Sequence, residues 1–289
     1  MFTERAIRLQ CAGAPLVGIA HSPSGTSRIG VLIIVGGPQY RVGSHRQFVL
    51  LSRYLAQQGL AAFRFDYRGI GDGVGPARNF LAIDDDIKAA IDAFGRECPG
   101  LEEIYLWGLC DAASAALLYA YRDERIAGIV LCNPWVRTEA TFSKAIVKDY
   151  YRKQIFSSTF WRRFVNGKLD VGKSLSSFTA HLRTSFARAS NAERPDTPAA
   201  TSEHEFPARM LSGLKLFKGR VLLILSGNDL TAAEFDNLIR EDREWADALR
   251  KKRAVVRRLP AANHTFSTRA WRDQVGLWTA EWIRNSSLE

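Results

Sequence analysis

The chain has 289 residues, of which 46% are hydrophobic and 11% aromatic, a composition that excludes an intrinsically disordered protein. No apolar run approaches the roughly 18 residues of a membrane span, and the start of the chain has no apolar stretch of signal-peptide length, so no transmembrane segment is expected and a cytoplasmic location is the default. The net charge of +10 comes mainly from residues 137–215, where 14 Lys and Arg stand against 7 Asp and Glu. Because no nucleic-acid-binding motif accompanies this charge, we interpret it as a solvated basic surface and expect no nucleic-acid partner.

Cysteine spacing and the end of the chain add two expectations. The four cysteines lie far apart and form no CxxC pair, so we expect free thiols, and neither a metal site nor a cofactor. Leu288 and Glu289 are expected to be the remnant of a purification tag.

The first half of the chain alternates short β-branched, apolar runs with longer stretches of helical period. This alternation is typical of parallel strands connected by helices. An antiparallel hairpin, residues 5–13 and 15–22, is expected to precede it. The expected parallel strands are residues 29–37, 60–69, 102–110 and 126–135, and the expected helices are residues 44–59, 80–98 and 111–125.

The alternation stops after residue 136 and resumes near residue 216. Between them lie aromatic, basic stretches of helical period and a segment rich in Pro, Ser and Thr that predicts a mobile loop near residues 191–206. We therefore expect a helical cap, residues 137–215, inserted into a core of residues 1–136 and 216–287. The predicted fold class is α/β, with a mostly parallel central sheet and helices on both faces. The core is completed by expected strands at residues 219–229 and 253–260 and expected helices at residues 231–252 and 271–285.

The strongest local motif is WGLCDA, residues 107–112, at the junction of an expected strand and an expected helix. Such a junction forces a sharp turn, and the residue at its apex projects from the sheet between small neighbours. Gly108 and Ala112 flank Cys110 in this way. The motif resembles the nucleophile elbow of the α/β-hydrolase family, with Cys for Ser and Ala for the second Gly. The resemblance implies that fold and makes Cys110 the nucleophile, whereas a small-residue turn around a buried thiol is the alternative.

A nucleophile of this kind needs a base and an acid that orients the base. Of the five histidines, His264 follows the last expected strand, where this family carries its catalytic histidine. Asp229 ends the strand after the insertion and is the expected acid, because the family's chain order is nucleophile, acid, base. Some relatives carry the acid one strand earlier, but that strand ends at Asn133. Asp236 is a weaker candidate because it falls inside the next expected helix.

The residue after the nucleophile has two opposite interpretations. A helix N-terminus or a histidine partner favours the thiolate form of a cysteine, and Cys110 is expected at such a terminus. An ionised Asp111 beside the sulfur opposes that charge. An acid in the first helical turn is also a routine partner of the helix dipole, and we favour this structural role for the Asp111 carboxylate.

Attack on an acyl group produces an oxyanion, which preorganised backbone N–H groups stabilise. The expected donors are the N–H of Asp111 and the N–H of Gly37, in the loop after the first parallel strand. That loop resembles the HGGP loop of proline iminopeptidase-like hydrolases, with Val35 for the usual His, and Pro38 has no N–H to offer. A D-x-R-G-x-G turn at residues 66–71, frequent in the same family, is expected to be structural, and its glycines complete no dinucleotide-binding fingerprint.

Two segments, GGPQYRVGSHRQF and GLCDAASAA, most resemble the first type of exosortase A system-associated hydrolase. This resemblance implies a setting in bacteria that make exopolysaccharide and sort proteins to the envelope. We predict an acyl hydrolase that acts on an ester or thioester bond of a small molecule through a thioacyl intermediate on Cys110. The alternatives are acyl transfer from the same intermediate and a decayed hydrolase kept as a binding protein. Lactone opening, as in dienelactone hydrolases, is a lesser variant, and the oligomeric state is not predicted.

Overall fold

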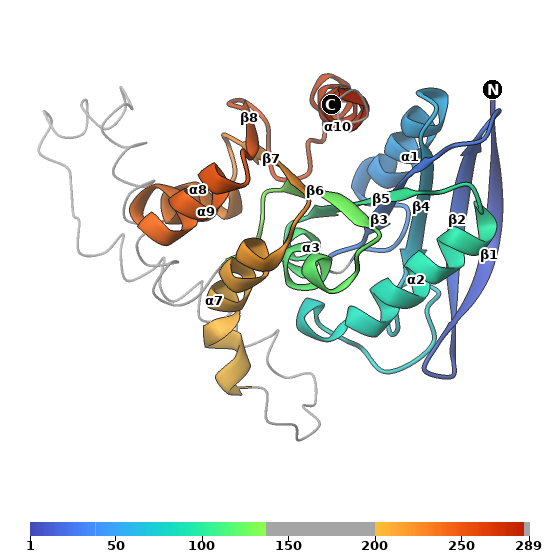
Figure 1. Ribbon diagram of the computed structural model, residues 1–289, viewed down its shortest axis with the longest axis horizontal. Coiled ribbons are helices and arrows are strands. Elements are labelled where there is room, and N and C mark those ends of the chain that lie inside the picture. The colour runs from blue at the N-terminus through green and yellow to red at the C-terminus, as the bar shows by residue number, and fades with distance from the viewer. Residues whose placement is uncertain (38, 137–199, 286–289) are drawn as a thin grey trace, which may run out of the picture.

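The computed structural model describes residues 1–37, 39–136 and 200–285, which form one eight-stranded sheet (Figure 1). The strand order is β1-β2-β4-β3-β5-β6-β7-β8. The strands β1 and β2 form the expected hairpin, β2 pairs antiparallel with β4, and β3 to β8 run parallel. The strands are β1 (Phe2–Cys11), β2 (Ala14–Pro23), β3 (Ile29–Ile34), β4 (Ala61–Asp66), β5 (Glu103–Leu109), β6 (Ile126–Cys132), β7 (Arg220–Ser226) and β8 (Val255–Leu259).

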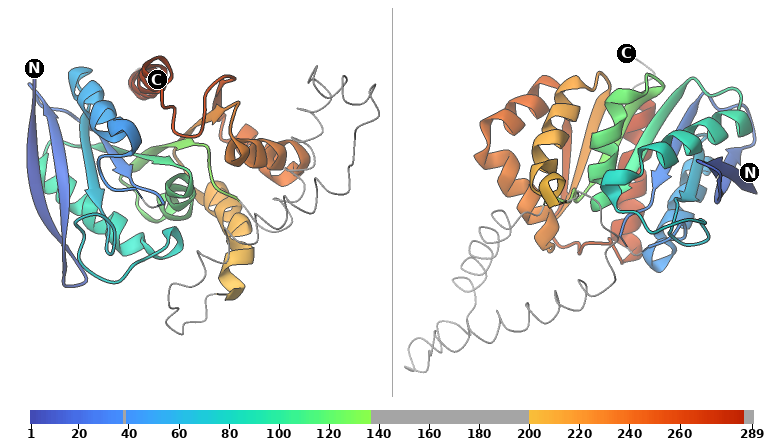
Figure 2. Two further views of the ribbon diagram at one scale, coloured as in Figure 1. Left: turned by 180° about the vertical axis from the view of Figure 1, so that it is seen from behind. Right: turned by 90° about the horizontal axis from the view of Figure 1, so that it is seen from below.

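Helices cover both faces of the sheet, as the alternating pattern predicts. One face carries α1 (Gln47–Gln57) and α10 (Arg269–Arg284), which contact each other (Figures 1 and 2). The opposite face carries α2 (Asp84–Glu97), α3 (Asp111–Tyr119), α7 (Ala200–Leu216), α8 (Leu230–Glu241) and α9 (Arg243–Lys251). Within the described residues, three short 3-10 turns accompany them, Ser44–Arg46, Phe80–Ala82 and Ala120–Arg122.

Each face of the sheet has its own hydrophobic core. The core under α1 and α10 includes Phe48 and Trp282, and the larger core on the other face includes Phe63 and Phe94, stacked at 5.4 Å between ring centroids. Because the central strands are covered on both sides, β3, β5, β6 and β7 are largely apolar instead of alternating, and β4 adds the buried Arg64 and Asp66. Residues of β3, from Gly30 to Ile34, are all buried.

The C-terminal helical segment differs from the expectation. Residues 231–252, predicted as one helix, form the two helices α8 and α9. The break is at Asp242, whose extended backbone (φ −94°, ψ 114°) ends α8 and whose side chain caps α9 by accepting hydrogen bonds from the N–H groups of Glu244 (2.8 Å) and Trp245 (3.3 Å). Aspartate stabilises this capping position more than a helix interior, which explains the interruption.

Most of the predicted cap lies outside the described residues, which resume at residue 200. The final part of the cap forms α7, which packs against α3 and α9 of the core. The prediction of a mobile loop near residues 191–206 is therefore wrong for residues 200–206, since these residues belong to α7. Phe206 supplies the physical reason, because its buried ring packs edge-on against Phe80 at 5.3 Å. In the described ranges no helix combines the length and apolar character of a membrane span.

Candidate functional site

The elbow predicted from WGLCDA lies between the end of β5 and the start of α3. Cys110 has φ 63° and ψ −126°, a backbone conformation that non-glycine residues rarely adopt. Neighbouring backbone maintains it, since the Cys110 N–H donates to the Cys132 carbonyl (2.9 Å) and the Cys110 carbonyl accepts from the Trp135 N–H (3.2 Å). A Cβ on Gly108 would lie 2.5 Å from the carbonyl carbon of Ala112, so a glycine is required there. The turn leaves Cys110 partly exposed at the carboxyl edge of the sheet.

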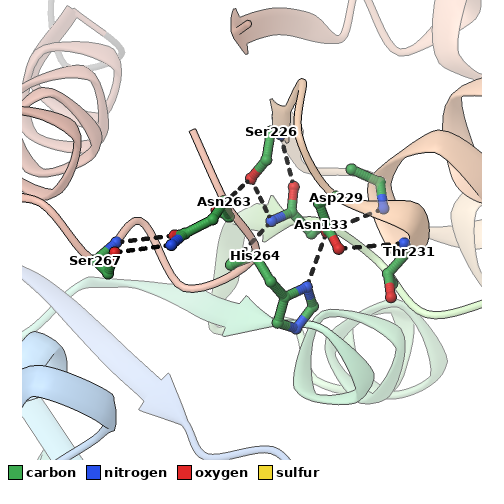
Figure 3. A network of polar contacts seen from close by, with 8 residues as sticks. Asn133, Ser226, Asp229, Thr231, Asn263, His264 and Ser267 are labelled. Carbon is green, nitrogen blue, oxygen red and sulfur yellow. Dashed lines mark hydrogen bonds and ion pairs between the residues drawn. The ribbon is translucent and has the colours of Figure 1, made fainter. Parts of the chain in front are cut away.

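Two polar residues predicted from chain order meet at the same edge. His264 lies in the loop between β8 and α10, and its Nδ1 is 2.8 Å from Oδ2 of Asp229, which follows β7 (Figure 3). Asp229 also caps α8, because its carboxylate accepts hydrogen bonds from the N–H groups of Thr231 (3.3 Å) and Ala232 (3.1 Å). The same carboxylate therefore begins a helix and orients the imidazole.

The imidazole of His264 has a strongly shifted proton affinity. Burial lowers its pKa, but the hydrogen bonds with Asp229 and Cys110, together with the charges of both groups, outweigh burial and raise the pKa to about 10. The imidazolium form is thus favoured at neutral pH. This interaction links the three residues that the sequence picked out separately.

A fourth residue of this region, Asn133, was not predicted. It follows β6, is fully buried and has φ 45°. Its Nδ2 donates to the His264 carbonyl (2.9 Å) and to Ser226 Oγ (2.7 Å), and its Oδ1 accepts from the Ser226 N–H at 2.9 Å (Figure 3). Asn133 thus ties the histidine loop to β6 and β7. A sequence signal existed, since an amide directly after a buried strand and before Pro134 is a polar group that requires partners.

The histidine loop carries a further local tether. Asn263 Nδ2 donates to Ser267 Oγ (2.8 Å), and the Ser267 N–H donates back to Asn263 Oδ1 at 3.1 Å (Figure 3). The Asn263 carbonyl accepts from Ser226 Oγ at 3.0 Å. The loop that presents His264 is therefore held on both sides of the histidine.

The two expected oxyanion donors have an unexpected neighbour, the Asp111 carboxyl. The Gly37 N–H donates to Asp111 Oδ2 (2.8 Å), and the Ala112 N–H donates to Asp111 Oδ1 (3.0 Å). The prediction that this carboxylate only complements the helix dipole is therefore incomplete, and the Gly37 N–H expected to face a substrate oxygen already has an acceptor. Burial raises the pKa of Asp111, against the opposing effect of these N–H groups and of His264.

The loop after β3 is anchored although Val35 stands at the position of the histidine in the HGGP loop that it resembles. Val35 is buried, and Oε1 of Gln39 accepts from the Ser44 N–H (3.4 Å) and from Gln47 Nε2 (3.3 Å). Further along, the Arg41 N–H donates to Oδ1 of the fully buried Asp66 at 2.6 Å, and the Arg41 guanidinium pairs with the same carboxylate. The turn that begins at Asp66 therefore has the structural role expected of it.

Within the described residues, the weaker acid candidate, the other histidines and a further buried acid take no part in the hydrogen bonds of His264. Asp236 pairs with Arg240 and Arg258 (2.6 and 2.7 Å) beside a cavity of about 460 Å³ that neither Cys110 nor His264 lines. Asp86 is buried in an ion pair with Arg68 at 2.7 Å. Among the other histidines, burial and the neighbouring Arg64 lower the pKa of His21 to about 4, His45 lies in a 3-10 turn, and His181 and the His204 side chain are outside the described residues.

Cys11, Cys98, Cys110 and Cys132 are all free thiols. In the described part of the chain, no group of three or more His, Cys, Asp or Glu side chains is arranged to hold a metal ion.

Comparison with known proteins identifies the family of the chain. Structural relatives include the esterase Pf2001 of Pyrococcus furiosus (14% identity, TM-score 0.65, 98% of this chain and 93% of that one) and Est1E of Butyrivibrio proteoclasticus, solved with ferulic acid (14%, 0.65, 98% and 100%). A dienelactone hydrolase of Anabaena variabilis is also similar (16%, 0.58, 98% and 98%). No curated protein sequence gives a significant match. A family model described as serine aminopeptidase, S33, matches residues 29–266, and the chain therefore belongs to this family of α/β-hydrolases.

Proposed function

We propose that the protein hydrolyses an ester or thioester bond of a small acyl substrate through a covalent thioacyl intermediate on Cys110. The observation that carries the proposal is geometric: Cys110 stands at the sharp turn between β5 and α3, and His264 is held by Asp229 at the same edge of the sheet, with 2.8 Å between Nδ1 and Oδ2. The pKa of His264, raised to about 10 by its hydrogen bonds with Asp229 and Cys110, supports it. An imidazole that keeps its proton to such a pH is a poor base toward a serine hydroxyl. It suits a cysteine, because the sulfur can exist as a thiolate paired with the imidazolium.

The proposed reaction has two stages. The Cys110 thiolate attacks the acyl carbon, a carbon–sulfur bond forms, and the carbonyl electrons move to oxygen. When this intermediate collapses, the bond to the leaving alkoxide or thiolate breaks, and His264 protonates the leaving group. Water then attacks the thioester with His264 as base, which releases the carboxylic acid and the thiolate. Asp229 accepts the Nδ1–H and leaves Nε2 free for the reaction.

Trapping of the intermediate tests the proposal. Incubation with short p-nitrophenyl esters or thioesters is expected to add the mass of the acyl group to the peptide that contains Cys110, and Cys110→Ala is expected to lose both adduct and turnover. Cys98→Ala is the matched control, because Cys98 is another free, partly exposed thiol that lies at the end of α2. The absence of adduct and turnover across a panel of acyl lengths would contradict the proposal.

Two further measurements, product partition and the rate of Cys110 alkylation, separate hydrolysis from acyl transfer and from binding without catalysis. Acyl transfer requires that an added amine or alcohol capture the acyl group in preference to water. A binding protein without catalysis requires that the rate of Cys110 alkylation be unaffected by His264→Ala. Hydrolysis is supported when free acid is the main product and His264→Ala slows alkylation at neutral pH.

We further propose the setting of the first type of exosortase A system-associated hydrolase. The likeness of residues 36–48 and 108–116 to those proteins supports it. Co-occurrence of the coding gene with exopolysaccharide and exosortase genes is expected, and its occurrence in genomes that lack them would argue against this setting.

A further inference from the structure

The Asp111 carboxyl occupies the position at which the site is expected to bind an oxyanion. Oδ2 accepts from the Gly37 N–H, Oδ1 accepts from the Ala112 N–H, and the N–H of Asp111 itself also interacts with the carboxyl. Gly37 and Asp111 are the two residues whose N–H groups were expected to hold the substrate oxygen. One side chain of the protein thus engages both donors.

The loop after β3 is shaped around this carboxyl. A Cβ on Gly36 would lie 2.1 Å from Asp111 Oδ1, so only glycine leaves space for the side chain in this orientation. The carboxyl is also close enough to the reacting groups to influence them, since the charges of Asp111 and His264 act on each other and the Asp111 charge contributes to the raised pKa of Tyr67. This placement distinguishes Asp111 from an ordinary acid at a helix N-terminus, which faces solvent.

An ionised carboxylate at this position conflicts with acyl chemistry. The substrate oxygen becomes negative as the thiolate adds, and two anions cannot share the same backbone donors without strong repulsion. A neutral carboxyl removes the conflict, because one oxygen still accepts a backbone N–H while the hydroxyl donates. A carboxylic acid kept neutral by its surroundings is an effective hydrogen-bond donor to an oxyanion.

We propose that Asp111 is a catalytic residue of this site, whose protonated carboxyl donates a hydrogen bond to the acyl oxygen during attack by Cys110. The proposal rests on the acyl chemistry proposed above. As the carbon–sulfur bond forms and the carbonyl electrons move to oxygen, the Asp111 hydroxyl stabilises the negative charge. When the intermediate collapses, the electrons return, the leaving group departs with a proton from His264, and Asp111 retains its own proton.

The charges that face Asp111 determine the direction of the pH dependence. Burial, the largest effect, raises the pKa of Asp111, whereas the surrounding N–H groups and the His264 imidazolium lower it, and the balance is a raised pKa. Burial raises the pKa of the nearby Tyr67, so that phenol stays neutral and adds no charge beside Asp111. The active form is the acid, so acylation is expected to slow as pH rises through the pKa of Asp111.

The test is the pH profile of Cys110 acylation, measured as single-turnover kcat/KM with a short thioester, in the full chain and two variants. The wild type is expected to lose activity about tenfold per pH unit above the pKa of Asp111. Asp111→Asn retains a donor that does not titrate, so its profile should be flat over that range. Asp111→Leu removes the donor and should be slower by about 10²- to 10³-fold at every pH.

Controls separate this role from folding and from the proposed function. Urea unfolding verifies that both variants are folded, and Asp85→Asn, which removes an exposed acid from the first turn of α2, should reproduce the wild-type profile. If Asp111→Leu equals or exceeds the wild-type rate, the carboxyl only obstructs the site. If Asp111→Asn retains the alkaline decline, another group titrates. Either result overturns the inference while the thioacyl adduct persists, whereas a wild type without any adduct removes the proposed function and this inference together.

Discussion

Asp229→Asn is the substitution that most directly tests how the imidazole is controlled. In the wild type, Oδ2 of Asp229 lies 2.8 Å from His264 Nδ1, and the same carboxylate accepts from the N–H groups of Thr231 and Ala232 at the start of α8. Asparagine is as good an N-cap as aspartate, so the helix start survives and the change removes mainly the negative charge. The substitution therefore isolates the electrostatic effect of Asp229 on His264.

The size of the effect follows from the contact. A hydrogen bond to a charged group contributes about 1.5 to 3 kcal/mol, and one pKa unit corresponds to about 1.4 kcal/mol, so the pKa of His264 is expected to fall by about 1 to 2 units. The lower part of that range is favoured, because the His264 side chain is 34% exposed and solvent screens the pair. Since the wild-type pKa is raised to about 10, the stabilising effect of the imidazolium is complete below about pH 6.5 and is lost as pH rises through 10. In the variant this loss is expected at lower pH.

Proton NMR titration of the His264 ring measures the midpoint directly. Asp242→Asn is the matched control, because Asp242 caps α9 with the same kind of hydrogen bonds, to Glu244 and Trp245, and has no contact with the imidazole. A midpoint that Asp229→Asn leaves unchanged would refute the reasoning. So would an equal shift in Asp242→Asn, which would assign the effect to helix stability.

Three further substitutions test the hydrogen bonds, the buried ion pair and the tight turn that hold the core and the site in place. Asn133→Ala removes three hydrogen bonds and leaves the buried Ser226 N–H without its acceptor. The free energy of unfolding, measured by urea denaturation, is expected to fall by about 2 to 4 kcal/mol, and Cys110 acylation is expected to slow. An unchanged urea midpoint would contradict this. Asp86→Ala removes the buried carboxylate that pairs with Arg68 and leaves the guanidinium only the exposed Asp85, at 3.6 Å. The substitution should cost about 3 to 5 kcal/mol by the same measurement, whereas a loss below about 1 kcal/mol would mean that Asp85 or water replaces the partner. Gly108→Ala places a Cβ 2.5 Å from backbone of α3, so the thioacyl adduct should disappear even where circular dichroism shows a folded chain.

The regular part of the fold was predictable because its signals are local. Burial on both faces makes β3, β5, β6 and β7 largely apolar runs, and the helices between the strands have their own period and end signals. The expected hairpin and the mostly parallel sheet are confirmed. Local signals failed at residues 231–252, because the capping preference of Asp242 interrupts a helical pattern that is continuous in the sequence. They also failed at residues 200–206, because packing of Phe206 on Phe80 supports a helix that the composition does not favour.

The sequence by itself determined the architecture, the elbow around Cys110 and the chain order of Cys110, Asp229 and His264. These depend on neighbouring residues and on the rule that parallel strands bring their carboxyl ends to one edge. Only the tertiary structure decided which hydrogen-bond partners meet there, because donors and acceptors that are distant in the chain compete for the same positions. The Gly37 N–H was expected to donate to a substrate oxygen, but it donates to the carboxyl group of Asp111, 74 positions away. The role of Asn133 was decided in the same way, by a histidine loop 131 positions further along the chain.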